Sequence, residues 1–345
     1  MLKLRRGIVV AEEPLTVDVE GERRHAWADP ALVGEVREGD EVVVNVEALD
    51  LRLGSGGFDV VHANLTRGMQ RGDSVGSHVI KLNYTSLQHA VEPVERTEEE
   101  AAAERAAPIP VLVIPLHGHL APAAWAAAEA APGLRVGFVQ TAGGALPGRL
   151  SRDVAELRSR AYLCGHITAA PAYGGEQEAV SVVGALDAAA SKLGWEAIIA
   201  GPGPGILGSA SRYGHGGMAA LDTAHAALSL GLPTLLSPRL SRADPRPRHR
   251  GVSHHTATVL ELLLDAVEVP SPAGEEDVGA ELEPLLGGRH RPRPLPVDLG
   301  GYAASGLPAR TMGRGIDEDA LFFAAALASG RALAHDAAPQ GEEGG

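Results

Sequence analysis

The first 91 residues carry short β-branched runs that are separated by polar, glycine-containing turns. Such runs are typical of strands, and short strands at this spacing favour a small barrel or sandwich. The predicted strands include Gly7–Val10, Leu15–Val19, Glu41–Val46 and His78–Tyr84. We expect the last of these to close a β-rich, barrel-like N-terminal domain over residues 1–91.

From residue 108 onward, apolar strand-like runs alternate with Ala- and Leu-rich helical stretches. The predicted strands are Val111–Leu116, Arg135–Gln140, Leu163–Ala169, Ala197–Ala200, Thr234–Ser237 and one near Leu295–Leu299. The predicted helices are Ala121–Ala131, Ser151–Arg160, Glu176–Leu193, Met218–Leu230, His254–Ala266 and Asp317–Leu333. This alternation predicts an α/β domain over residues 108–335, with a mostly parallel sheet and helices on both faces.

Three further segments differ in composition from both domains. Residues 92–107 are acidic and then Ala-rich, which predicts a solvated helix or a linker between the domains. Residues 268–294 are rich in Glu, Pro and Gly, and we expect an exposed insertion there. Residues 336–345 are small and polar, which predicts a disordered tail.

Composition and charge narrow the classes of function. The formal net charge of −14 disfavours nonspecific nucleic-acid binding. One cysteine, Cys164, excludes an internal disulfide framework, and its apolar surroundings indicate a buried thiol. No apolar run is long enough to span a membrane. We therefore expect a cytoplasmic protein without membrane contact, and we also expect a homo-oligomer.

Glycine-rich loops follow two of the predicted strands. Gly143 and Gly144 follow the second strand, and Gly203, Gly205 and Gly208 follow the fourth. Because ligands of open parallel sheets bind beyond the carboxyl ends of the strands, we expect backbone N–H groups of these loops to face a substrate or anion. A purely structural loop is the alternative. The spacing of the last three glycines resembles a dinucleotide fingerprint, but no helix follows at once, which argues against a nucleotide cofactor.

Residues 244–256 are unusually basic for an acidic chain. Arg246, Arg248 and Arg250 stand close together, and Ser253 is a suitable N-cap for the predicted helix that follows. Arginine forks beside a helix N-terminus suit a phosphate or a carboxylate. We expect Arg314, beyond the last predicted strand, to join them. The alternative is an exposed basic loop that pairs with acidic residues of the same protein.

Histidines supply the candidate chemistry. His254 and His255 follow Ser253, and either could act as general acid or base because imidazole titrates near neutral pH. His117 and His119, at the end of the first predicted strand, resemble the paired ligands of metal-dependent hydrolases, with His117 as a catalytic candidate. Further residues available to a metal are His166, His215, His249, Asp244 and Glu178. Hydrogen bonding of these histidines to backbone groups is the alternative.

Long segments resemble a known family. They are residues 80–88, residues 244–256 and residues 312–323. Together they are similar to a bacterial family known as domain of unknown function 3866, over nearly the whole chain. Asn83 stands where a basic residue is usual in that family, and Ala320 where a proline is usual. The resemblance implies one globular bacterial protein, and it carries no activity or functional residue with it.

These observations leave three hypotheses. The first is an enzyme that binds a small anionic, phosphorylated substrate at the strand ends, where glycine loops, arginines and histidines are expected to converge. The second is a metal-dependent hydrolase that uses His117 and His119. The third is a non-catalytic partner-binding or assembly protein, in which the barrel recognises the partner. The sequence names no cofactor.

Overall fold

The computed structural model describes residues 2–53, 56–68, 77–102, 107–209 and 211–338. The chain forms two compact units, Met1–Glu92 and Pro93–Gly345, so that the division falls at the start of the acidic segment. Each unit is described by itself below. No helix in the described part of the chain is both long enough and apolar enough to cross a membrane.

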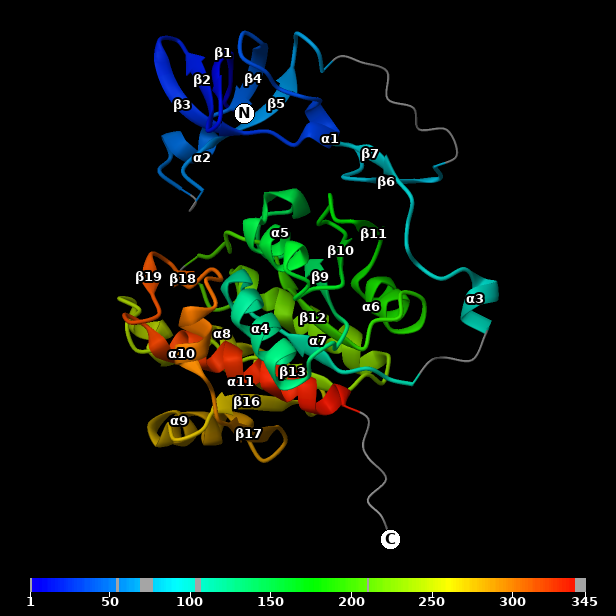
Figure 1. Ribbon diagram of the computed structural model, residues 1–345, viewed down its shortest axis with the longest axis vertical. Helices are drawn as coiled ribbons and strands as arrows, with labels where there is room; N and C mark the ends of the chain where they lie inside the picture. The colour runs from blue at the N-terminus through cyan, green and yellow to red at the C-terminus, as the bar shows by residue number, and fades with distance from the viewer. Residues whose placement is uncertain (1, 54–55, 69–76, 103–106, 210, 339–345) are drawn as a thin grey trace. The chain divides into compact units, whose positions relative to one another are not determined.

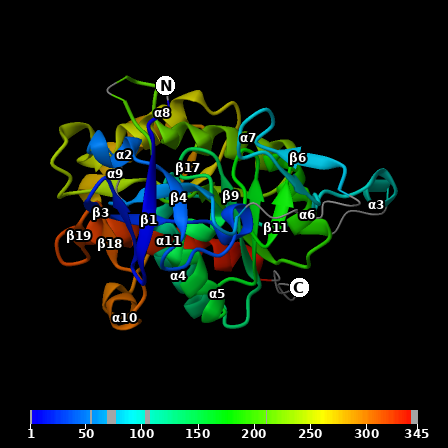
Figure 2. The ribbon, with the colours of Figure 1, turned by 90° about the horizontal axis from the view of Figure 1, so that it is seen from above.

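A closed barrel of five strands forms the N-terminal unit, with the strand order β1-β2-β3-β5-β4 (Figures 1 and 2, blue). The strands are β1 (Leu4–Glu12), β2 (Leu15–Val19), β3 (Glu22–Trp27), β4 (Glu41–Asn45) and β5 (Asp59–Asn64), and two short helices, α1 (Pro30–Val33) and α2 (Glu47–Asp50), accompany them. Strand side chains alternate between two faces, so Val42 and Val44 of β4 are buried while Val43 is not. The core is built almost wholly from valines. The predicted small barrel is confirmed.

The strand predicted over His78–Tyr84 does not close this barrel. The structure has a shorter strand, β6 (Val79–Lys81), which pairs only with β7 (His89–Val91) in a separate two-stranded sheet. Positive φ angles at Leu82 and Tyr84 end the extended conformation early. The barrel closes instead through the parallel pairing of β3 with β5.

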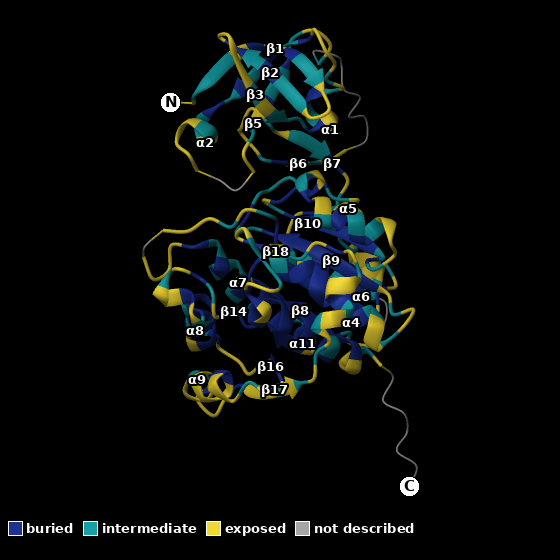
Figure 3. Cartoon of the chain, turned by 60° about the vertical axis from the view of Figure 1, so that its left-hand side comes forward, coloured by how far each residue is buried: buried dark blue, intermediate teal, exposed yellow. Residues whose placement is uncertain are grey.

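The second unit is built on an eight-stranded sheet with the order β11-β10-β9-β12-β8-β13-β16-β17. The strands are β8 (Val111–Val113), β9 (Val136–Thr141), β10 (Gly165–Ala169), β11 (Gln177–Ala179), β12 (Ala197–Pro202), β13 (Thr234–Leu236), β16 (Glu268–Pro272) and β17 (Arg291–Leu295). Every pairing in the sheet is parallel. Because parallel strands are covered on both faces, the central strands β8 and β9 are buried throughout (Figure 3).

Helices cover both faces of the sheet, as predicted. The helices on one face are α4 (Leu120–Ala130), α5 (Arg152–Ser159), α10 (Leu299–Ala304) and α11 (Ala320–Ala337). Those on the other face are α6 (Val182–Ser191), α7 (Ala219–Ser229), α8 (His254–Leu262) and α9 (Glu276–Leu286). Alternate residues of β8 face the two cores: Val111 and Val113 pack on one side, and Leu112 packs on the other.

The exposed insertion predicted over residues 268–294 is wrong. These residues form β16, α9 and most of β17, and β16 lies inside the sheet between β13 and β17. The prolines that suggested a loop occupy tolerated positions. Pro292 and Pro294 lie on the edge strand β17, and Pro270 and Pro272 lie beyond the one pairing that β16 makes with β13. The late strand also ends at Leu295, so that Leu299 begins α10 instead.

Both ends of the second unit differ in detail from the sequence prediction. The acidic segment contains the short helix α3 (Glu98–Ala102), and Val94 before it is buried in the α/β core. The last helix extends to Ala337, and most of the predicted disordered tail, from residue 339 onward, lies outside the described residues.

Helices α4 and α11 approach each other so closely that their backbones touch. A Cβ atom placed on Gly330 of α11 would lie 2.0 Å from the carbonyl oxygen of Ala123 in α4. Backbone atoms cannot move away as the end of a flexible side chain can, so this contact requires glycine.

We expect Gly330→Ala to lower the free energy of unfolding of the α/β unit by about 1–3 kcal/mol, because it overpacks this contact. The matched control is Gly279→Ala in the exposed helix α9, where a Cβ would meet no atom within 4 Å. That change should raise stability by up to about 1 kcal/mol, since alanine favours helices over glycine. Thermal unfolding of both variants checks this, and shifts in the same direction would contradict the close packing.

Candidate functional site

The candidate site lies beyond the carboxyl ends of β12 and β13. β8 lies between these two strands, and its helix α4 lies on one face of the sheet, whereas α7 and α8, which follow β12 and β13, lie on the other. Neighbouring strands whose connections leave to opposite faces create a crevice where ligands of open α/β sheets bind. The loops after β12 and β13 meet at this crevice.

A compact excursion after β13 carries most of the predicted basic residues. Strand β14 (Leu240–Ser241) pairs antiparallel with β15 (Gly251–Val252), and a 3₁₀ turn over Pro247–His249 lies between them. Ser253 then caps α8, because its Oγ accepts the N–H of His255 at 3.2 Å. The predicted N-cap is therefore confirmed.

The Asp244 carboxylate is the centre of an arginine cluster. It is fully buried, accepts two hydrogen bonds from the Arg246 guanidinium at 2.9 and 2.8 Å and one from Arg239 at 3.0 Å, and lies 3.6 Å from a guanidinium nitrogen of Arg314. Burial on its own raises the pKa of Asp244, but the hydrogen bonds and charges of these arginines outweigh it and hold the pKa well below its usual range. The carboxylate is therefore ionised, and it fixes the arginines around it.

A second buried carboxylate, Asp319, ties this cluster to the start of α11. Its Oδ2 accepts hydrogen bonds from Ser241 at 2.7 Å and from Arg314 at 3.1 Å, and its Oδ1 accepts the N–H of Arg242 at 3.1 Å. Two of the arginines predicted to hold a ligand, Arg246 and Arg314, thus pair with carboxylates of the same protein. For these two residues the structure matches the alternative reading of the basic segment, in which its arginines pair with acidic residues of the same protein.

Four histidines cluster beside the arginines. His215, from the loop after β12, lies parallel to His255 with ring centroids 3.8 Å apart. His254 lies 4.5 Å from His255 and 5.1 Å from His215, and His249 lies 4.8 Å from both His254 and His255. The loops after two different strands therefore meet in one imidazole cluster.

These imidazoles are held in the neutral form. Burial lowers the pKa of His249 to about 3, of His254 to about 4 and of His255 to about 2, and it lowers the pKa of His215 as well. The charge of Arg239 acts in the same direction on all four. Each ring therefore keeps an unprotonated nitrogen at neutral pH.

Arg248 differs from the other arginines of the cluster. It is exposed and makes no hydrogen bond or ion pair with any described residue, while its charge lowers the pKa of His215 and His254. Arg250 is also exposed, and among the described residues its side chain donates to the backbone carbonyl of Asp244 alone, at 3.0 Å. The cluster carries five positive charges against the two negative charges of Asp244 and Asp319. Its arginines are Arg239, Arg246, Arg248, Arg250 and Arg314.

The glycine loops pack against one another. A Cβ on Gly143 would lie 2.4 Å from the Gly216 carbonyl oxygen, and one on Gly144 would lie 2.2 Å from that of Gly203. Gly208 forms an isolated bridge with His215. Gly143, Gly144 and Gly203 thus bring the loops after β9 and β12 together, which is the structural alternative, whereas the bridge of Gly208 lies within the loop after β12. Gly205 adopts a positive φ of 71° within the same turn.

Among the described residues, His117 and His119 do not belong to a group of three side chains that could hold a metal ion. His117 donates from Nδ1 to the Pro202 carbonyl at 3.2 Å, and its Nε2 accepts the Ser151 hydroxyl at 2.7 Å. His119 bonds to Ser237 at 2.9 Å and packs on the Phe322 ring. Both are buried, and burial lowers the pKa of His119 to about 3. The two imidazole rings thus hydrogen-bond to different neighbours, which matches the alternative in which these histidines have a structural role.

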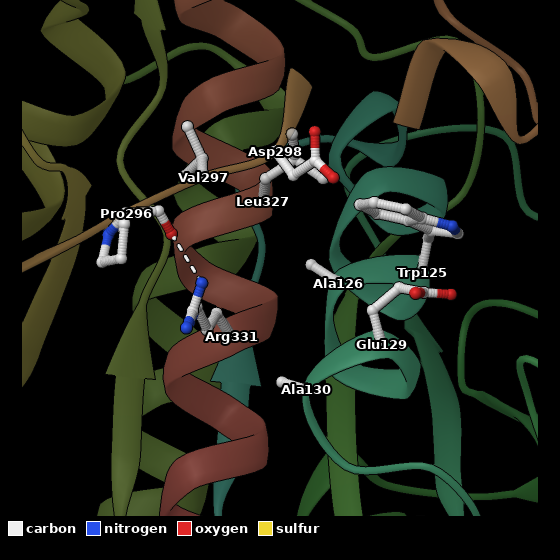
Figure 4. A pocket seen from close by; sticks show the side chains of 9 residues that line it. All are labelled: Trp125, Ala126, Glu129, Ala130, Pro296, Val297, Asp298, Leu327 and Arg331. Atoms are coloured by element: carbon white, nitrogen blue, oxygen red, sulfur yellow. Dashed lines mark hydrogen bonds between the residues drawn. The ribbon is translucent and has the colours of Figure 1, made fainter. Parts of the chain in front are cut away.

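A small cleft lies apart from the cluster, between α4 and α11 (Figure 4). It encloses about 210 Å³, and Arg331 at its wall donates to the Pro296 carbonyl at 3.3 Å. The side chains of Glu129 and Asp298 line it as well. Two acidic groups disfavour an anionic ligand, so the cleft is not the site that the sequence predicts.

The residues that organise the cluster were not singled out by the sequence. Asp244 belongs to the basic segment and Arg239 lies just before it, but nothing along the chain showed that they pair. Asp319 reads as an ordinary acidic residue at a helix start. Its position immediately before a long apolar helix suits the helix N-terminus and gives no sign of the contact with Arg314. His215 was available only as one histidine among several.

The chain was compared with known protein families, curated proteins and solved structures. The sequence model of one family matches residues 25–330, and the family is described as protein of unknown function (DUF3866). The chain belongs to this family. The match begins in β3 and ends in α11, so the DUF3866 region includes the entire arginine and histidine cluster. No curated protein and no solved structure matches the chain significantly.

We expect Asp244→Asn to lower the free energy of unfolding by about 3–5 kcal/mol, because it leaves a buried arginine without its counter-charge. Arg239 is only 4% exposed and would carry most of this penalty. The control is Asp277→Asn, which removes an exposed partner of Arg242 and should change the melting temperature little. Thermal unfolding compares the two variants, and equal effects would contradict the role of Asp244.

Proposed function

We propose that the α/β unit is an enzyme that binds a small anionic substrate, best a phosphorylated one, at the strand-end cluster. The observation that carries the proposal is Arg248: an exposed guanidinium without a carboxylate partner among the described residues, beside neutral imidazoles. A free arginine fork matches the oxygen atoms of phosphate or carboxylate.

The electrostatics of the cluster support an anion. The chain carries a net charge of −14, yet the arginines gathered here outnumber their buried carboxylates. Arg239, Arg246 and Arg314 are tied to Asp244 or Asp319, which leaves Arg248 and Arg250 to meet a ligand. A locally positive site on an acidic protein attracts small anions and repels acidic surfaces.

The imidazoles supply reactive groups next to this anion site. A neutral imidazole nitrogen can accept a proton or bind a metal ion, and the cluster offers several within a few ångströms of one another. Of His215, His254 and His255, His254 is the least buried. Its Nε2 has no hydrogen-bond partner in the described chain. A substrate held by Arg248 would therefore lie next to unsatisfied nitrogen atoms.

A bacterial origin, a cytoplasmic location and a homo-oligomeric state stay predictions from the sequence. They fit the proposed activity, since small phosphorylated compounds are largely substrates of the cytoplasm.

We expect Arg248→Glu to abolish anion binding without unfolding the protein, because Arg248 makes no contact that the fold needs. The measurement is thermal shift of the full chain with inorganic phosphate, sulfate, sugar phosphates, nucleotides and carboxylates. A ligand at 100 times its Kd adds about 2.7 kcal/mol, which raises the melting temperature by roughly 2–4 °C per kcal/mol.

The control is Arg23→Glu, which reverses an exposed barrel arginine with the same change in net charge. It should leave the shifts intact. An Arg248→Glu protein that responds like the wild type shows that the anion binds elsewhere, and a wild-type protein that responds to no anion overturns the proposal.

A further inference from the structure

Three of the clustered histidines have the arrangement of metal ligands. Among the described residues, His215, His254 and His255 form the one group of three His, Cys, Asp or Glu side chains whose ligand atoms all lie within 4.8 Å of one another. They come from two separate segments, the loop after β12 and the first turn of α8. His215 and His255 are buried, and His254 is partly exposed, so the group is reached from one side.

Hydrogen bonding fixes the tautomer of His215. Its Nε2 lies 3.0 Å from the carbonyl oxygen of Arg212, and a carbonyl can only accept, so Nε2 carries the proton. The lone pair of this neutral ring is therefore on Nδ1. That atom is buried and has no hydrogen-bond partner in the described chain. Metal-binding histidines commonly donate their other N–H to a backbone carbonyl in this way.

Gly217 leaves room for an ion between two of the rings. A point at the position of a Cβ on Gly217 lies 2.9 Å from Nδ1 of His255 and 3.0 Å from Nδ1 of His215. The backbone of Gly217 has no positive φ that would require glycine. The absence of a side chain here therefore keeps open a space that borders Nδ1 of both rings.

His254 completes the group from the same helix turn as His255. Its Nε2 is buried and has no hydrogen-bond partner in the described chain, like Nδ1 of His215. Bonds from zinc to imidazole nitrogen are about 2.0–2.1 Å long. His215 and His255 stack with an interplanar angle of 7°, so one of these two rings has to turn out of the stack before both nitrogens face one ion. Such a movement is within the reach of side-chain rotation.

We propose that His215, His254 and His255 bind a divalent transition-metal ion of the zinc class. Three imidazoles with a fourth position open are the ligand set of catalytic rather than structural zinc sites, and imidazole ligands suit Zn²⁺, Co²⁺, Ni²⁺ and Cu²⁺. The role of the ion in catalysis rests on the proposed function, in which the anion at Arg248 becomes its fourth ligand.

The charge of the cluster couples the two ligands. Arg239 donates to Nδ1 of His255 at 3.4 Å, so a cation bound there displaces this contact and meets positive charge. An anion at Arg248 offsets that repulsion. Metal and anion should therefore each raise the affinity of the protein for the other by the same factor, as linkage requires.

The test uses full-length, tag-free protein that has been stripped with a chelator and returned to chelator-free, sulfate-free buffer. Co²⁺ alone is titrated, with binding followed by calorimetry and by the visible absorption of the bound ion. The wild type is expected to bind one Co²⁺ per chain. Gly217→Ala, which fills the space between the rings, and His254→Gln should each weaken binding by more than the 10- to 100-fold typical of losing an outer contact.

Matched controls keep the result specific. Gly208→Ala lies in the same loop, where a Cβ would come no closer than 3.8 Å to another atom, and should bind Co²⁺ like the wild type. The double change of His117 and His119 to Gln tests the other histidine pair. If Gly217→Ala fails to fold, judged by circular dichroism, the partly exposed His254 decides the question.

The two proposals fail in different ways. Less than one Co²⁺ per chain, or Co²⁺ lost with His117 and His119 but retained in Gly217→Ala and His254→Gln, overturns the metal site. Addition of sulfate then tests the anion: tighter Co²⁺ binding that disappears in Arg248→Glu supports the coupling, whereas no effect of sulfate on the wild type overturns it while leaving the metal site standing.

Discussion

The buried ion pairs of Asp244 are the interaction on which the strand-end cluster depends. A carboxylate removed from water requires compensating charge, and three arginines provide it here. Their pairing holds the excursion between β13 and α8 in one conformation, and that excursion carries His249 and leads into His254 and His255. The arginines so used are structural, whereas Arg248 makes no ion pair with a carboxylate in the part of the chain that the structure describes.

Close backbone packing provides the second constraint. The loops after β9 and β12 lie so close that glycine is needed where their backbones touch, as at Gly143 against Gly216. This packing supports the loop that carries His215, whose ring lies on the face of His255. The glycines that were expected to face a ligand therefore act on the position of that loop. Gly217 alone borders the space between two imidazole nitrogens directly.

Periodicity along the sequence was enough to predict the architecture. The alternating valines of β4 predict a barrel strand, and the apolar runs of β8, β9 and β12 predict a buried parallel sheet. Each of these patterns lies within the element itself. Strand β3 has no such pattern, since its charged residues remain outside the core, and the prolines of β16 and β17 imitate a loop. These elements are defined by their neighbours in space and not by their own residues.

The position of the candidate site could be predicted from the sequence, but the contacts between its side chains could not. Arg246, Arg248, Ser253 and His254 were expected at a strand end, and they lie there. Arg314 is paired by Asp319, which reaches the cluster from the start of α11. No local pattern encodes contacts over that separation. The same reason hides the meeting of His215 with His255, whose segments come together only once the sheet has formed.

The account is tested most directly by a crystal structure of the full chain grown with Co²⁺ and tungstate, a tetrahedral anion whose position anomalous scattering reveals. The account predicts cobalt among His215, His254 and His255, with tungstate beside it on Arg248. Tungstate absent from Arg248 and bound elsewhere on the α/β unit, with no cobalt among these histidines, would contradict it.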